Sequence, residues 1–499
     1  MPDLNPYDHT EVPQIVHPQK RGRQSYLLLI TAVAALGGFL FGFDTGVVSG
    51  LNESVKAYFL LSETMEGFFV SSVTIGCIVG AVLAGFASDA LGRKKVLLFS
   101  GILLFVSALG CGFPPNFTGL IAFRFIGGVG VGVASMVAPL YISEIAPASI
   151  RGRLVTLFQL AIVFGIFAAY ASNALIWSLH DILPADSKIP GISRVFVNEN
   201  WRGMFLMGCI PAALYFFATF FVPESPRWWA GKNRDDKAMS TLERLFGRDE
   251  AERGMREIHA VLAEETGKFS EIFSRKYRFG LIIGVALMFF SQVTGINVIM
   301  YFGNQVFKEA GYSPTFSYLL QTFVGLANIA FTLFAVWKID QWGRKPLLRL
   351  GTMSIFIALA LIGTLFALKS HGIGEGVLLY LLPVLIVLFI ASFAMSWGPI
   401  PWVVVSEIFP TRIRGRAASI GTMTIWISCF LVVQTFPWLR EKAPELSFAI
   451  YAGLMIPALI FVWRYLPETK GRSLEELEKY LYSSVNKTAL SKSKSNDNR

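Results

Sequence analysis

The sequence predicts an all-α membrane protein with about twelve transmembrane helices in two six-helix halves, joined by a small helical linker. Two observations predict this class. The first is composition: 54% of the 499 residues are hydrophobic, only 16% are charged, and the mean hydropathy is +0.54. Such a chain is too apolar for an ordinary water-soluble globule. The second observation is an internal repeat.

Three sequence motifs occur twice, in the same order and at the ends of long apolar runs. The second copy of each begins roughly 250 residues after the first, which indicates two homologous halves. The pairs are SEIAPASIRGR (143–153) with SEIFPTRIRGR (406–416), DALGRK (89–94) with DQWGRK (340–345), and PESPR (223–227) with PETKGR (467–472). Parallel duplication of a multi-helix membrane unit is typical of one class of secondary transporters.

The membrane spans are predicted from apolar segments that each approach or exceed the ~20 residues an α-helix needs to cross about 30 Å of hydrocarbon. Six segments precede the central linker and six follow it. They cover residues 26–49, 64–88, 95–113, 118–142, 154–177 and 202–222, then 279–303, 315–338, 347–368, 376–405, 417–437 and 446–466.

These segments divide the chain into consecutive parts. We expect a cytoplasmic arm (1–24), an N-terminal half (25–222), a linker of two or three short helices (223–275), a C-terminal half (276–467) and a cytoplasmic tail (468–499). Lys and Arg concentrate in the short loops on the linker's side, which predicts that both termini are cytoplasmic. We expect the protein to lie in the plasma (inner) membrane. The net charge of +10 reflects this bias, so we expect a lipid bilayer and no nucleic acid as partner.

Two ionisable residues fall well inside the predicted spans: Asp44 and Arg124. Ionisable groups in a membrane are costly and therefore indicate function. Helix rise places both in the outer third of the bilayer, so they are able to pair. A structural ion pair is one interpretation. A titratable carboxylate at this depth favours the other, a proton relay.

Neutral polar and aromatic residues within the spans predict a binding site for an uncharged solute. Amides both donate and accept hydrogen bonds, as a ligand made of hydroxyls requires, and an indole face suits the C–H surface of a sugar ring. Hydrogen bonds between helices and simple packing are the alternative roles. The candidates are Gln159, Gln292, Asn297, Asn328, Trp397 and Trp426.

Charged residues recur symmetrically at the inner ends of the helices, within the repeated motifs. We expect them to form ion pairs between the two halves and so act as a cytoplasmic gate that holds an outward-facing state. They are Arg93, Glu144, Arg153, Glu224, Arg344, Glu407, Arg416 and Glu468.

Other kinds of chemistry lack a pattern in this sequence. No nucleophile–base pair or phosphate-binding loop is apparent, so we do not expect an enzyme. The four cysteines lie singly inside apolar runs, which argues against a disulfide framework or a metal site. We expect no cofactor.

The motifs together resemble the sugar porter family of the major facilitator superfamily over about residues 25–475. Further matching stretches are GFLFGFDTGVVSG (38–50), RFIGGVGVG (124–132), QVTGIN (292–297) and SWGPIPW (396–402). The pattern is most similar to the bacterial xylose–proton and plant sugar–proton symporters of that family. The resemblance implies the major facilitator fold and a monomer that imports a monosaccharide or related polyol with a proton by alternating access.

The resemblance also implies roles for individual residues. Asp44 corresponds to the family's proton site and Arg124 to its partner, while the six amide and tryptophan candidates correspond to sugar contacts. The chain departs from relatives at Ile166, Ser291 and Gly208, so several of the sugar hydrogen bonds found in relatives are missing here. A facilitative sugar uniporter remains the alternative function, and a non-transporting sugar sensor is a more distant one.

Overall fold

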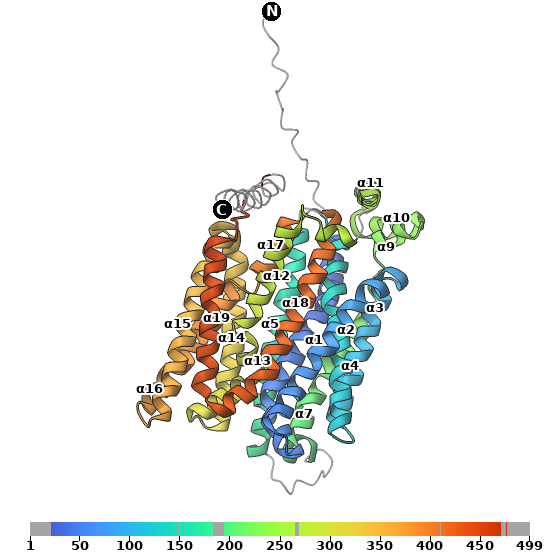
Figure 1. Cartoon of the computed structure of the whole chain (residues 1–499). Coiled ribbons are helices and arrows are strands. Elements are labelled where there is room, and N and C mark those ends of the chain that lie inside the picture. Colours follow the sequence, from blue (N-terminus) through green and yellow to red (C-terminus); the bar gives the residue numbers. More distant parts are fainter. Residues whose placement is uncertain are drawn as a thin grey trace, which may run out of the picture.

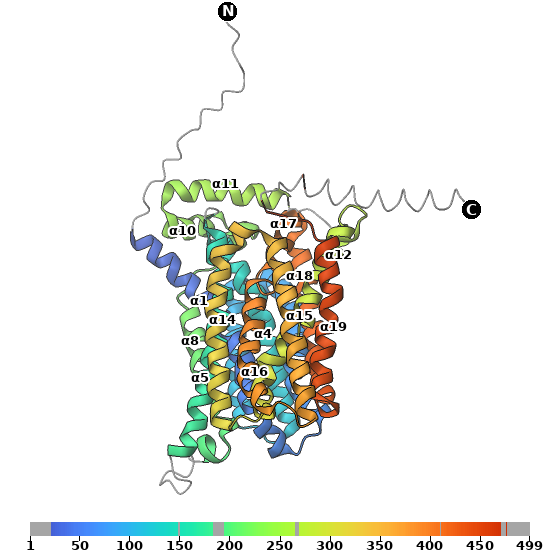
Figure 2. The same ribbon diagram turned by 90° about the vertical axis from the view of Figure 1, so that its left-hand side faces the viewer.

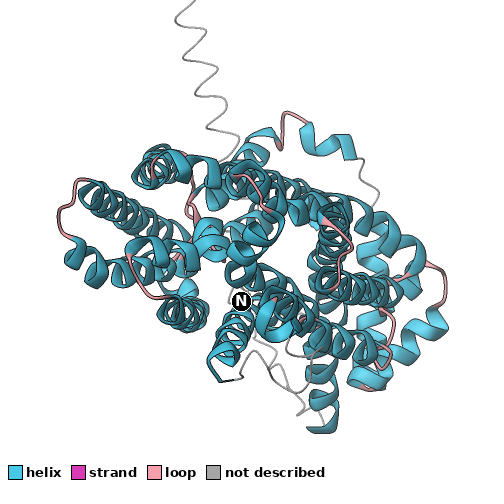
Figure 3. Cartoon of the chain, turned by 90° about the horizontal axis from the view of Figure 1, so that it is seen from below, coloured by secondary structure: helices cyan, strands magenta, loops and turns pink. Residues whose placement is uncertain are grey.

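The computed structural model describes residues 21–147, 150–182, 194–264, 269–409, 411–470 and 476. Within these ranges every regular element is a helix (Figure 3). Among the described residues, twelve helices or helix pairs are long and apolar enough to cross a membrane. The predicted all-α class with twelve spans is therefore confirmed. Most of the predicted N-terminal arm (1–20) and of the tail beyond residue 470 lies outside the described residues.

The first six spans are formed by five single helices and one broken helix. They are α1 (Arg21–Phe59), α2 (Glu63–Leu91), α3 (Arg93–Gly112), α4 (Phe117–Ile145), α5 (Arg151–Ile182) and the pair α7 (Asn200–Met207) and α8 (Cys209–Thr219). A short π-helical turn, η1 (Arg194–Asn198), precedes α7.

The last six spans include two broken helices. They are α12 (Arg278–Val293) with α13 (Ile296–Ala310), α14 (Pro314–Trp342), α15 (Arg344–Ser370), α16 (Glu375–Met395) with α17 (Ile400–Ile408), α18 (Thr411–Lys442) and α19 (Pro444–Arg464). Between the two sets lie the linker helices α9 (Pro226–Gly231), α10 (Asp235–Phe246) and α11 (Arg248–Glu264), followed by the 3₁₀ turn η2 (Phe269–Phe273).

Several helices begin at a side-chain cap. Ser62 accepts a hydrogen bond from the Met65 amide at the start of α2, and Asn116 accepts one from the Gly119 amide at the start of α4. Ser313 caps α14 in the same way. A cap satisfies one of the backbone N–H groups that a helix start leaves without a partner, so these polar residues fix where the spans begin in very short loops.

Glycines let the helices of the first six spans approach closely. A Cβ atom added at Gly42 of α1 would lie 1.9 Å from the Ile162 carbonyl of α5, and one added at Gly128 of α4 would lie 2.1 Å from the Val73 carbonyl of α2. No larger residue fits at either place without moving a backbone. Small residues at such contacts are typical of helix packing in membranes, and they hold α1, which carries Asp44, tightly against α5.

The two sets of spans stand side by side, with the linker helices across one end (Figures 1 and 2). Contacts between the sets run along α2 and α18, α5 and α14, and α1 and α13. Arg244 of α10 lies over the ring of Tyr26, 4.7 Å away, near the start of α1. We call the end that carries α9–α11 the linker side and the opposite end, where α2 begins and α18 ends, the far side.

The helices differ from the predicted segments mainly at their ends. α1 begins at Arg21 and continues to Phe59, ten residues past the predicted end at 49, and α18 continues to Lys442 rather than stopping at 437. Arg440 in the α18 extension is buried among partners on neighbouring helices, and Lys56 in the α1 extension is half-buried beside Glu66. Because their charge is neutralised there, the helix has no need to end where the apolar run does.

Candidate functional site

Asp44 and Arg124 form an ion pair between α1 and α4. Arg124 Nη1 lies 2.9 Å from Asp44 Oδ1, and the Arg124 side chain is 1% exposed. The guanidinium also lies near the faces of Phe69 and Phe205, 5.7 and 6.0 Å from the ring centroids. Aromatic faces attract a cation and help to replace lost hydration.

The pair is incompletely hydrogen-bonded. Among the described residues, no group accepts a hydrogen bond from Arg124 Nε or Nη2, although both atoms are buried. An isolated buried charge is strongly unfavourable, and removing one partner of such a pair costs about 3–5 kcal/mol. The first six spans therefore contain a charge pair that is costly to keep and that packing alone would not require.

Gln292 and Asn297 flank the break in the seventh span. α12 ends at Val293, and Gly295 has a φ of +83°, a left-handed conformation that favours glycine, before α13 begins. Asn297 Nδ2 donates to Gln292 Oε1 at 2.8 Å, and Gln292 Nε2 donates to Ser291 Oγ at 3.0 Å. The break thus presents a linked, half-buried pair of amides.

The two tryptophan candidates have different environments. Trp397, in the connection between α16 and α17, is buried, and its indole N–H donates to Thr352 Oγ1 at 3.0 Å. Trp426 of α18 lies against Phe41 of α1, with ring centroids 5.3 Å apart. Its buried indole nitrogen has no hydrogen-bond partner in the described part of the chain, so Trp426 has a donor available and Trp397 does not.

The remaining two amides lie on helices that pack against each other. Gln159 is half-buried on α5, and Asn328 is buried on α14. These two helices form one of the main contacts between the two sets of spans. One of the six candidates, Gln159, therefore comes from the first six spans, and the other five come from the last six.

On the linker side, the repeated motifs build two equivalent clusters. In the first, Arg93 binds Glu144 through two hydrogen bonds of 2.9 and 3.0 Å, and Ser225 Oγ donates to the same carboxylate at 2.5 Å. The Glu224 carboxylate accepts from the Arg93 amide at 2.8 Å. Gly92 has a φ of +97°, and a Cβ atom there would lie 2.3 Å from Glu224 Oε2, so glycine is required beside this carboxylate.

The second cluster repeats this design in the last six spans. Arg344 Nη2 binds Glu407 at 2.8 Å, and Thr469 Oγ1 donates to Glu407 at 2.5 Å in the role of Ser225. Glu468 accepts from the Arg344 amide at 3.1 Å. Gly343 has a φ of +85°, as Gly92 does in the first cluster.

Each cluster joins helices within its own set of spans, which differs from the predicted ion pairs between the two halves. Each arginine binds a carboxylate of its own half, because the three motifs of a half lie on different helices whose ends meet on the linker side. Arg153 is exposed at the start of α5, and Arg416 is half-buried on α18.

Glu224 and Glu468, which occupy equivalent places in the two clusters, differ in pKa. Burial raises the pKa of Glu224 above its ordinary value, and the surrounding amides and Arg93 oppose this only in part. Burial acts in the same direction on Glu468, but the backbone amides around that carboxylate outweigh it and lower its pKa. The two clusters are therefore similar in geometry without being electrostatically equivalent.

A second charged network lies on the far side and joins the two sets of spans. Glu66 of α2 is completely buried, with Lys56 Nζ 2.8 Å and Arg440 Nη2 3.3 Å from its carboxylate. The amides of Asn52 and Gln305 donate to it at 2.9 and 2.8 Å. Lys56 and Asn52 belong to the same half as Glu66, whereas Arg440 of α18 and Gln305 of α13 belong to the other.

Sequence reasoning missed this network. Glu63 and Glu66 look like favourable acidic residues at the start of a helix, and Arg440 lies beyond the apolar segment that predicted its span. Arg440 also contacts Glu63 at 3.2 Å and Glu309 at 3.3 Å. For charged residues at the ends of apolar runs, the sequence does not indicate whether the side chain is solvated or forms an ion pair with another such residue.

Comparisons with known proteins agree with this architecture. Residues 30–481 match the family described as "Sugar (and other) transporter". The chain is 37% identical over 492 residues to the D-xylose-proton symporter of Escherichia coli K12, covering 91% of this chain and 95% of that protein. It is 36% identical to the arabinose-proton symporter of Bacillus subtilis (91% and 95% covered) and 34% identical to the major myo-inositol transporter IolT of that organism (92% and 95%).

Solved structures show the same fold. The inward open conformation of the E. coli xylose transporter XylE superposes with a TM-score of 0.76 at 35% identity, covering 91% of this chain and all of that one. The XylE complex with 6-bromo-6-deoxy-D-glucose, which is described as a major facilitator superfamily proton:xylose symporter, gives a TM-score of 0.74. The chain is therefore a member of the Sugar (and other) transporter family, a multi-pass membrane protein with the major facilitator fold and not an enzyme.

Proposed function

We propose that this protein is a proton-coupled symporter that imports a monosaccharide or related polyol by alternating access. The observation that carries the proposal is the Asp44–Arg124 pair between two spans, with a separation of 2.9 Å, in a chain similar to sugar–proton symporters over most of its length. Protonation of Asp44 would discharge the pair and release α1 from α4. Movement of these helices would then depend on the proton.

We propose that the solute binds between the two halves, residues 25–222 and 276–467. Gln159 would contact it from the first half, and Gln292, Asn297, Asn328 and Trp426 from the second, because amides and a free indole N–H match vicinal hydroxyls. Trp397 would shape the site by packing, since its N–H is already bound to Thr352. Relatives named for xylose, arabinose, glucose and myo-inositol support a neutral polyhydroxylated solute.

We further propose an orientation and a conformation. Basic residues on the linker side support a cytoplasmic location for that side and for both termini, in the plasma (inner) membrane. The Glu66–Arg440 network then closes the outer side, which makes this conformation inward-facing. In the outward-facing state, the motif residues Arg93, Glu144, Arg344 and Glu407 and their neighbours would meet across the inner side as a gate.

The test is uptake into proteoliposomes of a panel of labelled D-xylose, arabinose, glucose and myo-inositol, with and without an imposed proton gradient. A symporter accumulates at least one of these solutes above its external concentration when the outside is acidic. Asp44→Asn should abolish this accumulation and still permit exchange of solute across the membrane, because exchange needs no net proton movement. Wild-type uptake that only equilibrates the solute, whatever the gradient, would instead identify a uniporter.

A further inference from the structure

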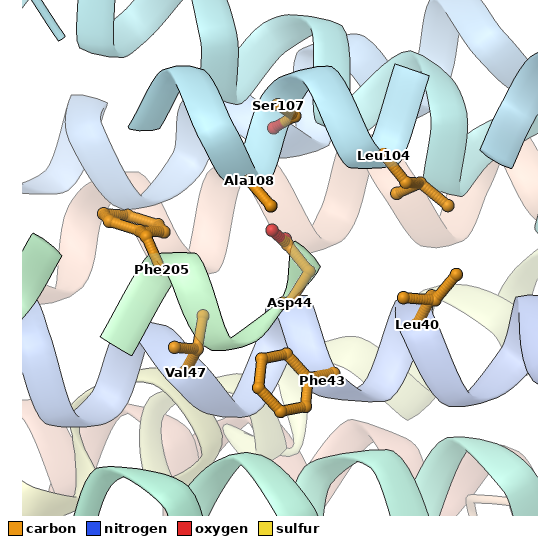
Figure 4. Close-up of a pocket in the computed structure, with 9 residues that line it drawn as sticks. Leu40, Phe43, Asp44, Val47, Leu104, Ser107, Ala108 and Phe205 are labelled. Carbon is orange, nitrogen blue, oxygen red and sulfur yellow. The ribbon is translucent and has the colours of Figure 1, made fainter. Parts of the chain in front are cut away.

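A small cavity of about 30 Å³ borders Asp44 within the first six spans (Figure 4). All of its lining residues belong to α1, α3 and the segment from α7 to Gly208. Asp44 and Ser107 are the two polar residues of this lining, and the others are apolar or glycine. None of the amides or tryptophans proposed to bind the solute lines it.

The Asp44 carboxylate faces this space. One oxygen is held by Arg124 at 2.9 Å, and the carboxylate points between α1 and α3 toward Ala108 (Figure 4). The Asp44 side chain keeps 21% of its surface accessible, whereas Arg124 keeps 1%. Asp44, rather than Arg124, is therefore the member of the pair that borders the cavity.

The cavity exists because the sixth span breaks beside it. α7 ends at Met207 and α8 begins at Cys209. Pro211 follows closely and has no N–H for the regular helix bond to residue 207. Gly208, at the break, leaves room among the lining residues. A Cβ atom there would lie 3.4 Å from Ala108 Cβ and 3.5 Å from the Phe43 ring, and 3.1 Å from the Phe205 carbonyl oxygen, which is a tight contact.

We propose that this cavity holds one or two water molecules that bind Asp44 and carry the proton to and from it. A volume of about 30 Å³ exceeds the 10–15 Å³ or so that one water requires, and an ionised carboxylate with a neighbouring hydroxyl supplies polar partners. A carboxylate whose second oxygen met only apolar groups would be strongly destabilised. The proton site would thus be reached inside the first half, separately from the solute residues.

The proton step balances with water as carrier. A protonated water in the cavity gives H⁺ to the free Asp44 oxygen, which leaves a neutral carboxylic acid and neutral water, and Arg124 keeps its charge. On release, the carboxylic acid returns the proton to cavity water and the ion pair with Arg124 forms again. This inference rests on the proposed function of Asp44 in coupling.

The test compares two identical substitutions. Gly208→Ala places a methyl group in the cavity, whereas Gly453→Ala adds one at an exposed position of α19 with nothing within 4 Å. Each variant is reconstituted and assayed with D-xylose, arabinose, glucose and myo-inositol for solute-driven proton entry, read by an internal pH dye, and for solute exchange. Gly208→Ala should slow proton entry by about two- to tenfold, the effect of one lost hydrogen bond, and change exchange much less. Gly453→Ala should alter neither.

If Gly208→Ala slows proton entry and solute exchange equally, the cavity matters only for packing. If Gly208→Ala changes neither rate, the cavity carries no proton. Both results overturn the inference. Should Gly208→Ala fail to assemble, Ser107→Ala removes the neighbouring hydroxyl with little loss of volume and must also slow proton entry more than exchange. Asp44→Asn separates the two proposals. If proton entry persists in Asp44→Asn, Asp44 has no coupling role. If Asp44→Asn loses proton entry but Gly208→Ala keeps the wild-type rate of proton entry, only the water-filled cavity is refuted.

Discussion

Replacing Glu66 with Gln should open the far side of the transporter. The buried carboxylate holds two groups of its own half, Lys56 and Asn52, and two of the other half, Arg440 and Gln305. When the far side opens, Glu66 loses only its contacts to Arg440 and Gln305 of the other half. A substitution that weakens these two contacts therefore shifts the equilibrium from the closed toward the open far side.

The magnitude follows from those two contacts. A hydrogen bond to a charged group contributes about 1.5–3 kcal/mol, and Arg440 keeps Glu63 and Glu309 as partners in the variant. Weakening both cross-half contacts of Glu66 should therefore disfavour the closed far side by about 3 kcal/mol, which corresponds to a hundredfold or so in the ratio of the two states.

The assay measures the distance between spin labels on the far side, at Met65→Cys of α2 and Gly376→Cys of α16, both exposed. Glu66→Gln should move the distance distribution to longer values. Glu53→Gln is the matched control, because Glu53 pairs across the halves with Lys308 but is 56% exposed, and exposed pairs contribute little. A distribution in Glu66→Gln that matches the control would refute the reasoning.

Three further predictions concern the solute site and the inner side. Gln292→Ala should raise the apparent KM for the transported solute by about two- to tenfold through loss of one hydrogen bond; an unchanged KM for every solute would exclude the contact. Trp426→Phe should weaken solute binding without lowering thermal stability, whereas Trp397→Phe, which loses the bond to Thr352, should lower the melting temperature; the reverse pattern would contradict the assignment of the free indole. Neutralising Glu144 and Glu407 together should raise accessibility to a thiol probe on the linker side and slow uphill uptake, and unchanged accessibility would exclude their role in a gate.

The sequence alone predicted the features that depend on one residue or one segment at a time. Long apolar runs specify spanning helices because a membrane leaves a polar backbone no other way to satisfy its hydrogen bonds. The duplicated motifs specified two similar halves, and the two linker-side clusters repeat each other as the motifs do. Asp44 and Arg124 were recognisable because a charge in the middle of an apolar run is costly wherever it points.

Only the tertiary structure decided which groups meet. Glu66 and Arg440 lie at the ends of their apolar runs, where exposure to water and pairing with a buried partner are equally consistent with the sequence. They contact each other because α2 packs against α18. Trp397 and Trp426 look alike in the sequence, yet a neighbouring helix supplies a hydrogen-bond acceptor to one and not to the other. The cavity at Asp44 depends on a break in α7–α8 and on the absence of a side chain at Gly208, on a span far along the chain. Such contacts arise from how helices are placed in space, and hydropathy along a single segment carries no information about that placement.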